Sequence, residues 1–365
     1  MISFNFFPSR RIAWYLGWSF LKTSFAVLIG LVVILAMLDL LGNSGRILAH
    51  EGNGQNELWR YVGLRIPQLI QQFLPFALLL GTLVTLASMN QHSEIIAMKA
   101  AGISAHQIIA PLILASLFVA AGNFVFNERI ATRATASLNA WADVKYGPVP
   151  PPTGAQTNVW VRLGDDLIFA RQVTGSGAET RLEGITIYDR TGGTLTGILE
   201  AQSARYANPG WELADTRRFD VESGNVAESA SLIVAPEVDP IQFTLASVDP
   251  NEQSFWELRR SIDELEAAGR SIRSAESSWW HKISGPLSST LMPLLAAIAA
   301  FGLARSGQLF LRAVLGMGLG FSYFIADNFA LAMGNFGAYP PFLAAWGPFF
   351  LFLLIGEAVL VRTEE

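Results

Sequence analysis

Few residue combinations in this 365-residue chain could carry out covalent chemistry. The absence of cysteine excludes disulfides, thiolate catalysis and Cys-ligated metals. None of the four lysines follows a glycine, so the chain has no Walker A phosphate-binding loop. The four histidines show no HExxH spacing, and no GxSxG nucleophile motif occurs. Asp165 and Asp166 are adjacent acids, but they fall at an expected hairpin tip, where a solvated turn is favoured. We therefore expect no catalytic residue, metal site or cofactor in this chain.

The composition points instead to a lipid environment. Hydrophobic residues make up 51% of the chain and charged residues only 15%, against about 25% in soluble domains. Charges are costly in the bilayer, which accounts for their scarcity. The net charge is −5 and the basic residues are scattered, so nucleic-acid binding is not expected.

Six apolar stretches are long enough to cross a membrane, because a spanning helix needs about 20 such residues. Lysines and arginines cluster beside alternate span ends, which predicts that both termini are cytoplasmic. The long interruption after the third span then lies on the periplasmic side. The expected spans are Trp14–Leu41, Ile66–Ser88, Ser104–Phe126, Ile283–Ala304, Phe310–Gly334 and Phe342–Val361.

The interruption, residues 127–278, has the pattern of a β domain. Three pairs of β-prone segments surround turn sequences at regular spacing, which predicts an antiparallel sandwich or jelly roll. A connecting helix over about 254–269 should follow, with Ser254 and Glu257 as a capping box and Gly269 at its end. The expected architecture is α+β, with membrane domains at 1–126 and 279–365.

A short charged helix is expected between the second and third spans, over about 93–102. Ser93 is a suitable N-cap, and Glu94 in the first turn complements the helix dipole. Gly102 is placed to end the helix. Ser104 and Gln107 then form a second capping box at the start of the third span.

A helix of about two turns is marginal alone in water, so it must pack against something. Ile95, Ile96 and Met98 offer apolar surface, and Glu94 and Lys99 offer charge. Two interpretations stay open: the helix lies on the lipid surface, or it contacts a cytoplasmic partner protein.

Acidic residues inside the spans are the remaining candidates for a functional site. Asp327 lies deep in the fifth span, where charges usually line a cavity or pathway. Asp39 and Glu357 lie near span ends and could instead reach headgroups or water. Aromatic residues near Asp327 could line a hydrophobic cavity or serve only packing; they are Phe321, Tyr323 and Phe324.

Three segments carry a resemblance to a known family: "LPFALLLGTLVTLASMNQHSEIIAMKAAGIS", "LEGITIYD" and "WWHKISGPLSSTLMPLLA". Together with the three-plus-three topology, they make almost the whole chain similar to the LptF/LptG permeases of lipopolysaccharide export, and to the LptG branch more closely. The resemblance implies a periplasmic β-jelly roll inserted into a multi-pass protein of the bacterial inner membrane. It also implies an ABC transporter subunit that extracts lipopolysaccharide and is not itself an enzyme.

The resemblance further implies the partners. They are an LptF-like permease, an LptB-like ATPase dimer that binds ATP and Mg, and an LptC-like protein that continues the periplasmic bridge. In this family the short cytoplasmic helix is a coupling helix. Its glutamate, matched here by Glu94, contacts the ATPase, and we expect Ile95, Met98, Lys99 and Gly102 to belong to the same contact.

One position departs from the family pattern. LptG relatives carry a lysine late in the first span that is associated with lipopolysaccharide phosphates, and the matching residue here is Ala36. Arg46 is the nearest cation in the following loop, so Arg46 joins Asp39 among the lipid-cavity candidates.

Two other classes of protein remain as alternatives. A lipoprotein-release type ABC permease would also need a coupling helix but commonly has four spans. A non-transporting membrane scaffold would not associate with an ATPase.

Overall fold

The computed structural model describes residues 8–149, 156–175, 179–207, 210–234, 249–267, 270–302 and 309–364, with Pro240 and Phe243 as isolated positions. The expected helix end at Gly269 and the expected span end at Ala304 lie outside the described residues. The chain divides into two compact units. One is built from helices and comprises Met1–Pro148, Pro250–Ile262 and Ser271–Glu365; the other, Val149–Asp249 with Asp263–Arg270, contains the sheet.

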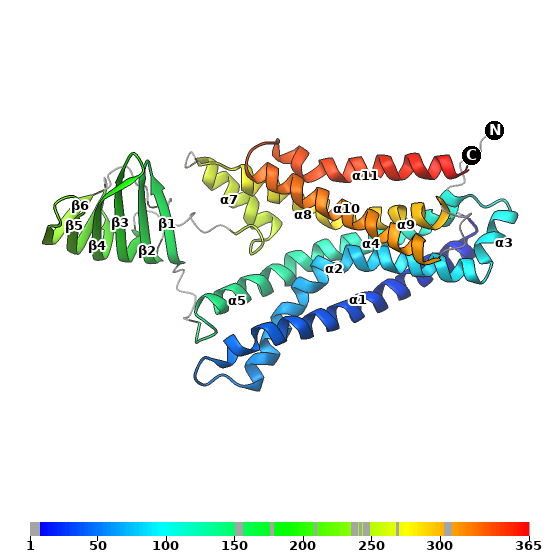
Figure 1. Ribbon diagram of the computed structural model, residues 1–365, viewed down its shortest axis with the longest axis horizontal. Coiled ribbons are helices and arrows are strands. Elements are labelled where there is room, and N and C mark those ends of the chain that lie inside the picture. Colours follow the sequence, from blue (N-terminus) through cyan, green and yellow to red (C-terminus); the bar gives the residue numbers. More distant parts are fainter. Residues whose placement is uncertain are drawn as a thin grey trace. The chain divides into compact units, whose positions relative to one another are not determined.

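The first half of the helical unit consists of three long helices with one short helix between the second and third (Figure 1). The third long helix, α4, passes through a π-helical turn, η1, and continues as α5, so it extends well beyond the expected end at Phe126. Residues 127–148 therefore belong to the helical unit. The elements are α1 (Arg10–Leu48), α2 (Gln55–Gln91), α3 (Glu94–Ala100), α4 (Ala105–Phe126), η1 (Asn127–Ala131) and α5 (Thr132–Asp143).

The second half begins with the connecting helix and contains a broken span. Helices α8 and α9 are bent by 44° at a short break, and α8 contains Pro286 near that break. Among the described residues, five helices are long and apolar enough to cross a membrane, and α8 with α9 makes a sixth span if the bent pair counts as one. The elements are α7 (Phe255–Ala267), α8 (Arg273–Ser288), α9 (Leu291–Gly302), α10 (Leu309–Asn335) and α11 (Pro341–Glu364).

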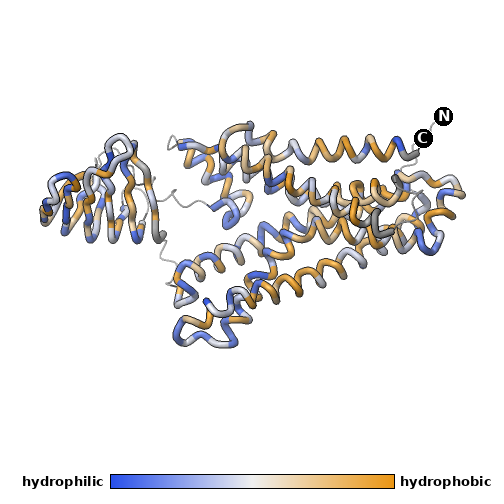
Figure 2. Tube along the Cα trace, viewed as in Figure 1, coloured by the Kyte–Doolittle hydropathy of each residue, from blue (hydrophilic) through white to orange (hydrophobic). Residues whose placement is uncertain are grey.

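Helix α2 is the most buried of the five helices that are each long enough to span a membrane. Within its most apolar segment 56% of the residues are buried, compared with 17% in α1 and 22% in α10. Figure 2 shows hydrophobic residues along the middle of α1 and α11, where much of the surface is exposed. Apolar faces left uncovered on α1 and α10 are suited to contact lipid or another membrane protein.

Close backbone contacts bring α2 against its neighbours. Gly81 on α2 lies directly against Ser24 on α1, where an added Cβ would be 2.6 Å from the Ser24 Cα atom. Gly316 and Gly320 on α10 lie against the side chains of Leu83 and Leu79. The Gly-xxx-Gly spacing in α10 therefore serves helix packing, as small residues do in membrane bundles.

The connecting helix α7 is fixed to the third span at the π-helical turn. The backbone N–H of Phe255 donates to both carboxylate oxygens of Glu128 at 2.8 Å. The predicted capping box is confirmed: the Ser254 N–H donates to Glu257 at 2.8 Å, and the Glu257 N–H donates to the Ser254 hydroxyl at 3.3 Å. The hydrogen bonds that the Glu257 carboxylate accepts from the Ser254 backbone N–H and from the Ser254 side chain hold the pKa of this carboxyl below its usual range.

The sheet unit contains six antiparallel strands in sequential order, β1 to β6. A jelly roll would place non-consecutive strands side by side, but the described strands form a simple meander because each pairs with the strand that follows it in the chain. The apolar residues of one face, including Val161, Ile185 and Leu213, form a separate core. The strands are β1 (Gln156–Leu163), β2 (Asp166–Thr174), β3 (Arg181–Thr191), β4 (Thr194–Tyr206), β5 (Trp211–Asp220) and β6 (Val226–Val234).

Candidate functional site

Helix α3 begins at Glu94, as the sequence predicts, but its cap differs from the prediction. Ser93 adopts a left-handed conformation with φ 60°, and its side chain makes no capping hydrogen bond. The carboxylate of Glu94 instead accepts hydrogen bonds from the Tyr15 hydroxyl at 3.0 and 3.2 Å. Glu94 thus ties α3 to the N-terminal part of α1 while remaining in the first turn of its own helix.

The C-terminal end of α3 is a Schellman motif. Gly102 has φ +81°, the conformation for which glycine is preferred. Its N–H donates to the Lys99 carbonyl at 3.0 Å, and the Ile103 N–H donates to the Met98 carbonyl at 3.1 Å. The prediction that Gly102 ends the helix is therefore confirmed.

The next helix starts immediately with the predicted capping box. The Gln107 N–H donates to the Ser104 hydroxyl at 3.2 Å, and the Ser104 N–H donates to the Gln107 side chain at 3.1 Å. Because both ends of the connection are fixed, α3 and the start of α4 form one rigid corner between the second and third spans.

The two faces of α3 differ in exposure. Ile95 is only 6% exposed and, with the partly buried Met98, packs into the core of the spans. A two-turn helix needs such side chains to hold it in place, and the expectation that Ile95 and Met98 contact a partner stays a prediction. Ile96 is 61% exposed, and Lys99 is exposed as well. The outward surface of α3 is therefore formed around Ile96 and Lys99.

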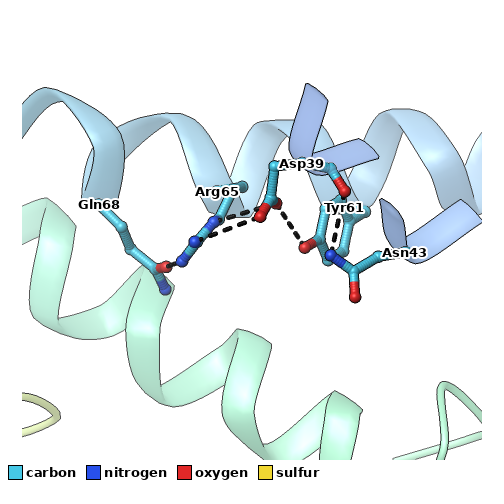
Figure 3. A network of polar contacts seen from close by, with 5 residues as sticks. All are labelled: Asp39, Asn43, Tyr61, Arg65 and Gln68. Carbon is cyan, nitrogen blue, oxygen red and sulfur yellow. Dashed lines mark hydrogen bonds and ion pairs between the residues drawn. The ribbon is translucent and has the colours of Figure 1, made fainter. Parts of the chain in front are cut away.

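Asp39 takes part in a polar network between α1 and α2 (Figure 3). Its carboxylate accepts from the Tyr61 hydroxyl at 2.6 Å and from Arg65 Nε at 3.1 Å, and Arg65 also bonds the Gln68 side chain. Asn43 donates to the Asp39 backbone carbonyl at 3.0 Å. Both charged side chains are partly buried, and the pair ties the two helices together.

Asp327 forms a second tie, between α10 and α8. Its carboxylate lies 2.9 Å from His281 Nε2. Asp327 and Tyr323 are buried, so they point into the helical unit rather than into an open cavity. Gly285 lies beside the His281 ring, where an added Cβ would come within 3.2 Å of Cε1, so glycine leaves room for the imidazole.

The aromatic candidates on α10 lie on different faces. Tyr323 packs against Phe352 of α11, with ring centroids 5.3 Å apart. Phe324 packs against Phe76 of α2, also with ring centroids 5.3 Å apart. Phe321 is exposed and continues the uncovered apolar face. Of the three, only Phe321 offers most of its side chain to a lipid or a partner.

The remaining residues of interest near the end of α1 differ in their exposure to solvent. The helix continues to Leu48, so Arg46 belongs to its last turn and not to a loop. Arg46 is exposed, whereas Ala36 is buried in the packed core. Glu357 on α11 lies 3.5 Å from the ring of His106 on α4.

A comparison with protein families adds the decisive observation. The family model for the lipopolysaccharide export system permease LptF/LptG matches residues 14–362. The chain belongs to this family. LptG of Haemophilus influenzae is 27% identical over 96% of this chain and 98% of its own length. LptG of Escherichia coli K12 is 25% identical over 83% of this chain and 84% of its own length.

Family membership confirms the α+β membrane architecture expected from the sequence. In this LptF/LptG permease, capping patterns in the sequence correctly identified the residues that end α3 and begin α4, which are Gly102, Ser104 and Gln107. Tyr15, Arg65 and His281 were missed as contact partners because each contacts a residue 26 or more positions away. Of these three, only Arg65 could have been anticipated from the sequence, because an acidic residue near a span end usually pairs with a cation.

The contact between His281 and Asp327 gives a testable prediction about the helical unit. We expect the substitutions H281Q and D327N to be non-additive, with a coupling of about 0.5–3 kcal/mol, because each removes the same buried contact. The measurement is a double-mutant cycle of thermal unfolding in detergent. Additive effects would contradict the pair, and an H106Q/E357Q cycle, at a more exposed contact, should show less coupling.

Proposed function

We propose that this chain is the LptG-like permease half of an ABC transporter that extracts lipopolysaccharide from the inner membrane. The observation that carries the proposal is membership of the LptF/LptG family along 14–362. The two relatives described above are both named as lipopolysaccharide export permeases, which supports lipopolysaccharide as the substrate.

Energy would enter through α3 from a separate LptB-like ATPase, which would bind ATP and Mg. The outward face around Ile96 and Lys99 is available for such a contact, while Ile95 and Met98 anchor the helix to the spans. Motion of the ATPase would pass through the rigid corner of α3 into α2 and α4. Glu94 contributes by its bond to Tyr15, which links the same corner to α1.

The lipid path would lie between this chain and an LptF-like partner. The uncovered apolar faces of α1 and α10, which include Ile34, Met37 and Phe321, are suited to such a pathway. The sheet unit would lie on the periplasmic side and receive acyl chains, and it would pass them to an LptC-like protein. With this orientation, α3 and both termini are cytoplasmic, in agreement with the distribution of Lys and Arg.

The span count bears on the alternative of a lipoprotein-release type permease. Such permeases commonly have four spans, whereas the described helices provide five, or six with the bent pair. A scaffold that does not transport is tested by the partners that the chain binds.

The proposal predicts the composition of the native complex. A tagged chain purified from its own host in mild detergent is expected to carry an ABC ATPase, a second permease and lipopolysaccharide, identified by mass spectrometry. Recovery of the chain alone, or with other membrane proteins but no ATPase, would contradict the proposed function. An unrelated tagged multi-pass protein from the same host serves as the control for non-specific lipid.

A further inference from the structure

The chain leaves the helical unit through a left-handed corner that directly follows α5. Lys145 and Tyr146 have φ angles of 52° and 62°, and the sheet unit begins at Val149. Neither corner residue is glycine, and the left-handed conformation crowds the Cβ atom against the following carbonyl oxygen. This crowding disfavours each residue by about five- to thirtyfold relative to the right-handed conformation. The corner therefore persists only because surrounding contacts hold it.

Backbone hydrogen bonds close the corner against the end of α5. The N–H groups of residues 145–147 each donate to a carbonyl three or five positions earlier, at 2.9 to 3.0 Å. The ring of His50, from the loop between α1 and α2, covers Gly147, where an added Cβ would lie 2.8 Å from His50 Cε1. The three N–H groups lose their partners when the corner opens, so their hydrogen exchange reports the opening.

Asn53, in the same loop between α1 and α2, holds the corner from outside. Its side-chain Nδ2 donates to the Tyr146 carbonyl at 2.9 Å and to the Ile47 carbonyl at 2.8 Å. Ile47 belongs to the last turn of α1, where carbonyls have no partner within their own helix. Asn53 therefore joins the end of α1 to a corner 93 positions further along the chain.

The ring of Tyr146 packs edge-to-face between two other aromatic rings. Its centroid lies 5.2 Å from that of Trp141, at an interplanar angle of 89°, and 6.2 Å from that of Tyr61, at 71°. Such arrangements are the favoured geometry of aromatic pairs. The Tyr61 hydroxyl also donates to Asp39 at 2.6 Å (Figure 3), so the corner rests on the network that joins α1 to α2.

From these contacts we infer that Asn53 acts as a clamp that sets the length of the connection to the sheet unit. With the clamp closed, the fixed part of the helical unit extends to Pro148. When Asn53 releases the Tyr146 carbonyl, residues 145–148 leave the corner and join the connection. Four extended residues span at most about 14 Å. The clamp thus changes the reach of the sheet unit without any change within the sheet.

The balance of contributions makes this corner a switch rather than a fixed joint. Each Asn53 hydrogen bond and each aromatic contact favours the closed form by about fivefold. The two left-handed residues oppose it by a similar overall factor. Because the opposing contributions are of comparable size, a small displacement of the end of α1 or the start of α2 shifts the populations of the two forms. The device does not depend on which cargo the chain moves, so it goes beyond the proposed function.

The test is hydrogen exchange of the purified full-length protein in detergent, measured by mass spectrometry on peptides that cover 145–147. N53D keeps the side-chain size but removes both donated bonds, so exchange there is expected to rise about tenfold or more. N43D is the matched control, because Asn43 donates to a backbone carbonyl within α1 and should leave this exchange unchanged. K145G relieves the left-handed strain and should slow exchange about fivefold, after correction for intrinsic rates.

Opposite effects of N53D and K145G on the same three N–H groups support the clamp, because a general loss of stability cannot produce both. Equal exchange in N53D and N43D, or exchange in K145G that is not slower than in the wild type, would overturn the inference. Faster exchange in N53D spread evenly over α1 and α5 would show a general loss of packing and would also overturn it. The measurement uses no ATP, lipid or partner, so its failure is distinguishable from a failure of the proposed function.

Discussion

Replacing Gly81 with leucine is expected to prevent normal packing of α1 against α2. The added Cβ would collide with the backbone of Ser24, at 2.6 Å from its Cα atom, and a change of rotamer cannot relieve a backbone contact. Overpacking typically costs about 1–3 kcal/mol, and a backbone clash at a helix crossing should reach or exceed the upper end. The measurement is thermal unfolding of the purified protein in detergent, followed by tryptophan fluorescence.

Alanine variants provide the matched comparison for this prediction. G81A introduces the same colliding Cβ and should lower the melting temperature. G30A places alanine in the interior of α1, where an added Cβ meets no atom within 4 Å. It should be neutral or stabilise the helix by up to about 1 kcal/mol. Equal melting temperatures for G81A and G30A would show that the crossing is not as close as described.

The second large effect is expected at the outward face of α3. I96R places a charge on a side chain that is 61% exposed and is proposed to face the ATPase. Loss of a central apolar contact in an interface costs about 2–4 kcal/mol, so ATPase binding should weaken at least about 30-fold. The measurement is binding of the purified ATPase to the membrane protein, together with the ATPase rate of the assembled complex.

I233R is the matched control for I96R. Ile233 lies on β6 and is 64% exposed, so the same substitution is made at a similarly exposed isoleucine outside α3. I233R should leave ATPase binding intact, and both variants should melt like the wild type. If I96R bound the ATPase with wild-type affinity, the outward face of α3 would not be the contact.

Apolar segments and local caps could be predicted from sequence because their causes lie within a few residues. Gly102, Ser104 and Gln107 are examples, since each acts on a backbone group of the same turn. Segment length also revealed the spans, although α4 continues past Phe126 through η1 and α5 as an unbroken series of helical turns. The fall in hydropathy after Phe126 marks the end of the apolar segment, but it does not mark the end of the helix.

The side-chain partners within the helical unit could not be predicted in the same way. Whether Ile95 or Ile96 faces the spans depends on how α3 is rotated against α2, and the alternation in a two-turn helix does not determine it. The tie between Asp327 and His281 likewise depends on how α8 and α10 are packed. The strand order was missed as well, because hairpin signals identify pairs of strands but not the order of the whole sheet.

The central claim is that ATP hydrolysed elsewhere moves lipopolysaccharide past the uncovered face of α10. A photo-cross-linking residue at Phe321 in the complete complex, reconstituted with lipopolysaccharide, tests this directly. The expected result is a lipopolysaccharide adduct at position 321 that decreases when ATP is added, and no such adduct at the control position Phe118, a 71% exposed residue of α4. An absent adduct at 321, or one unchanged by ATP, would contradict the account.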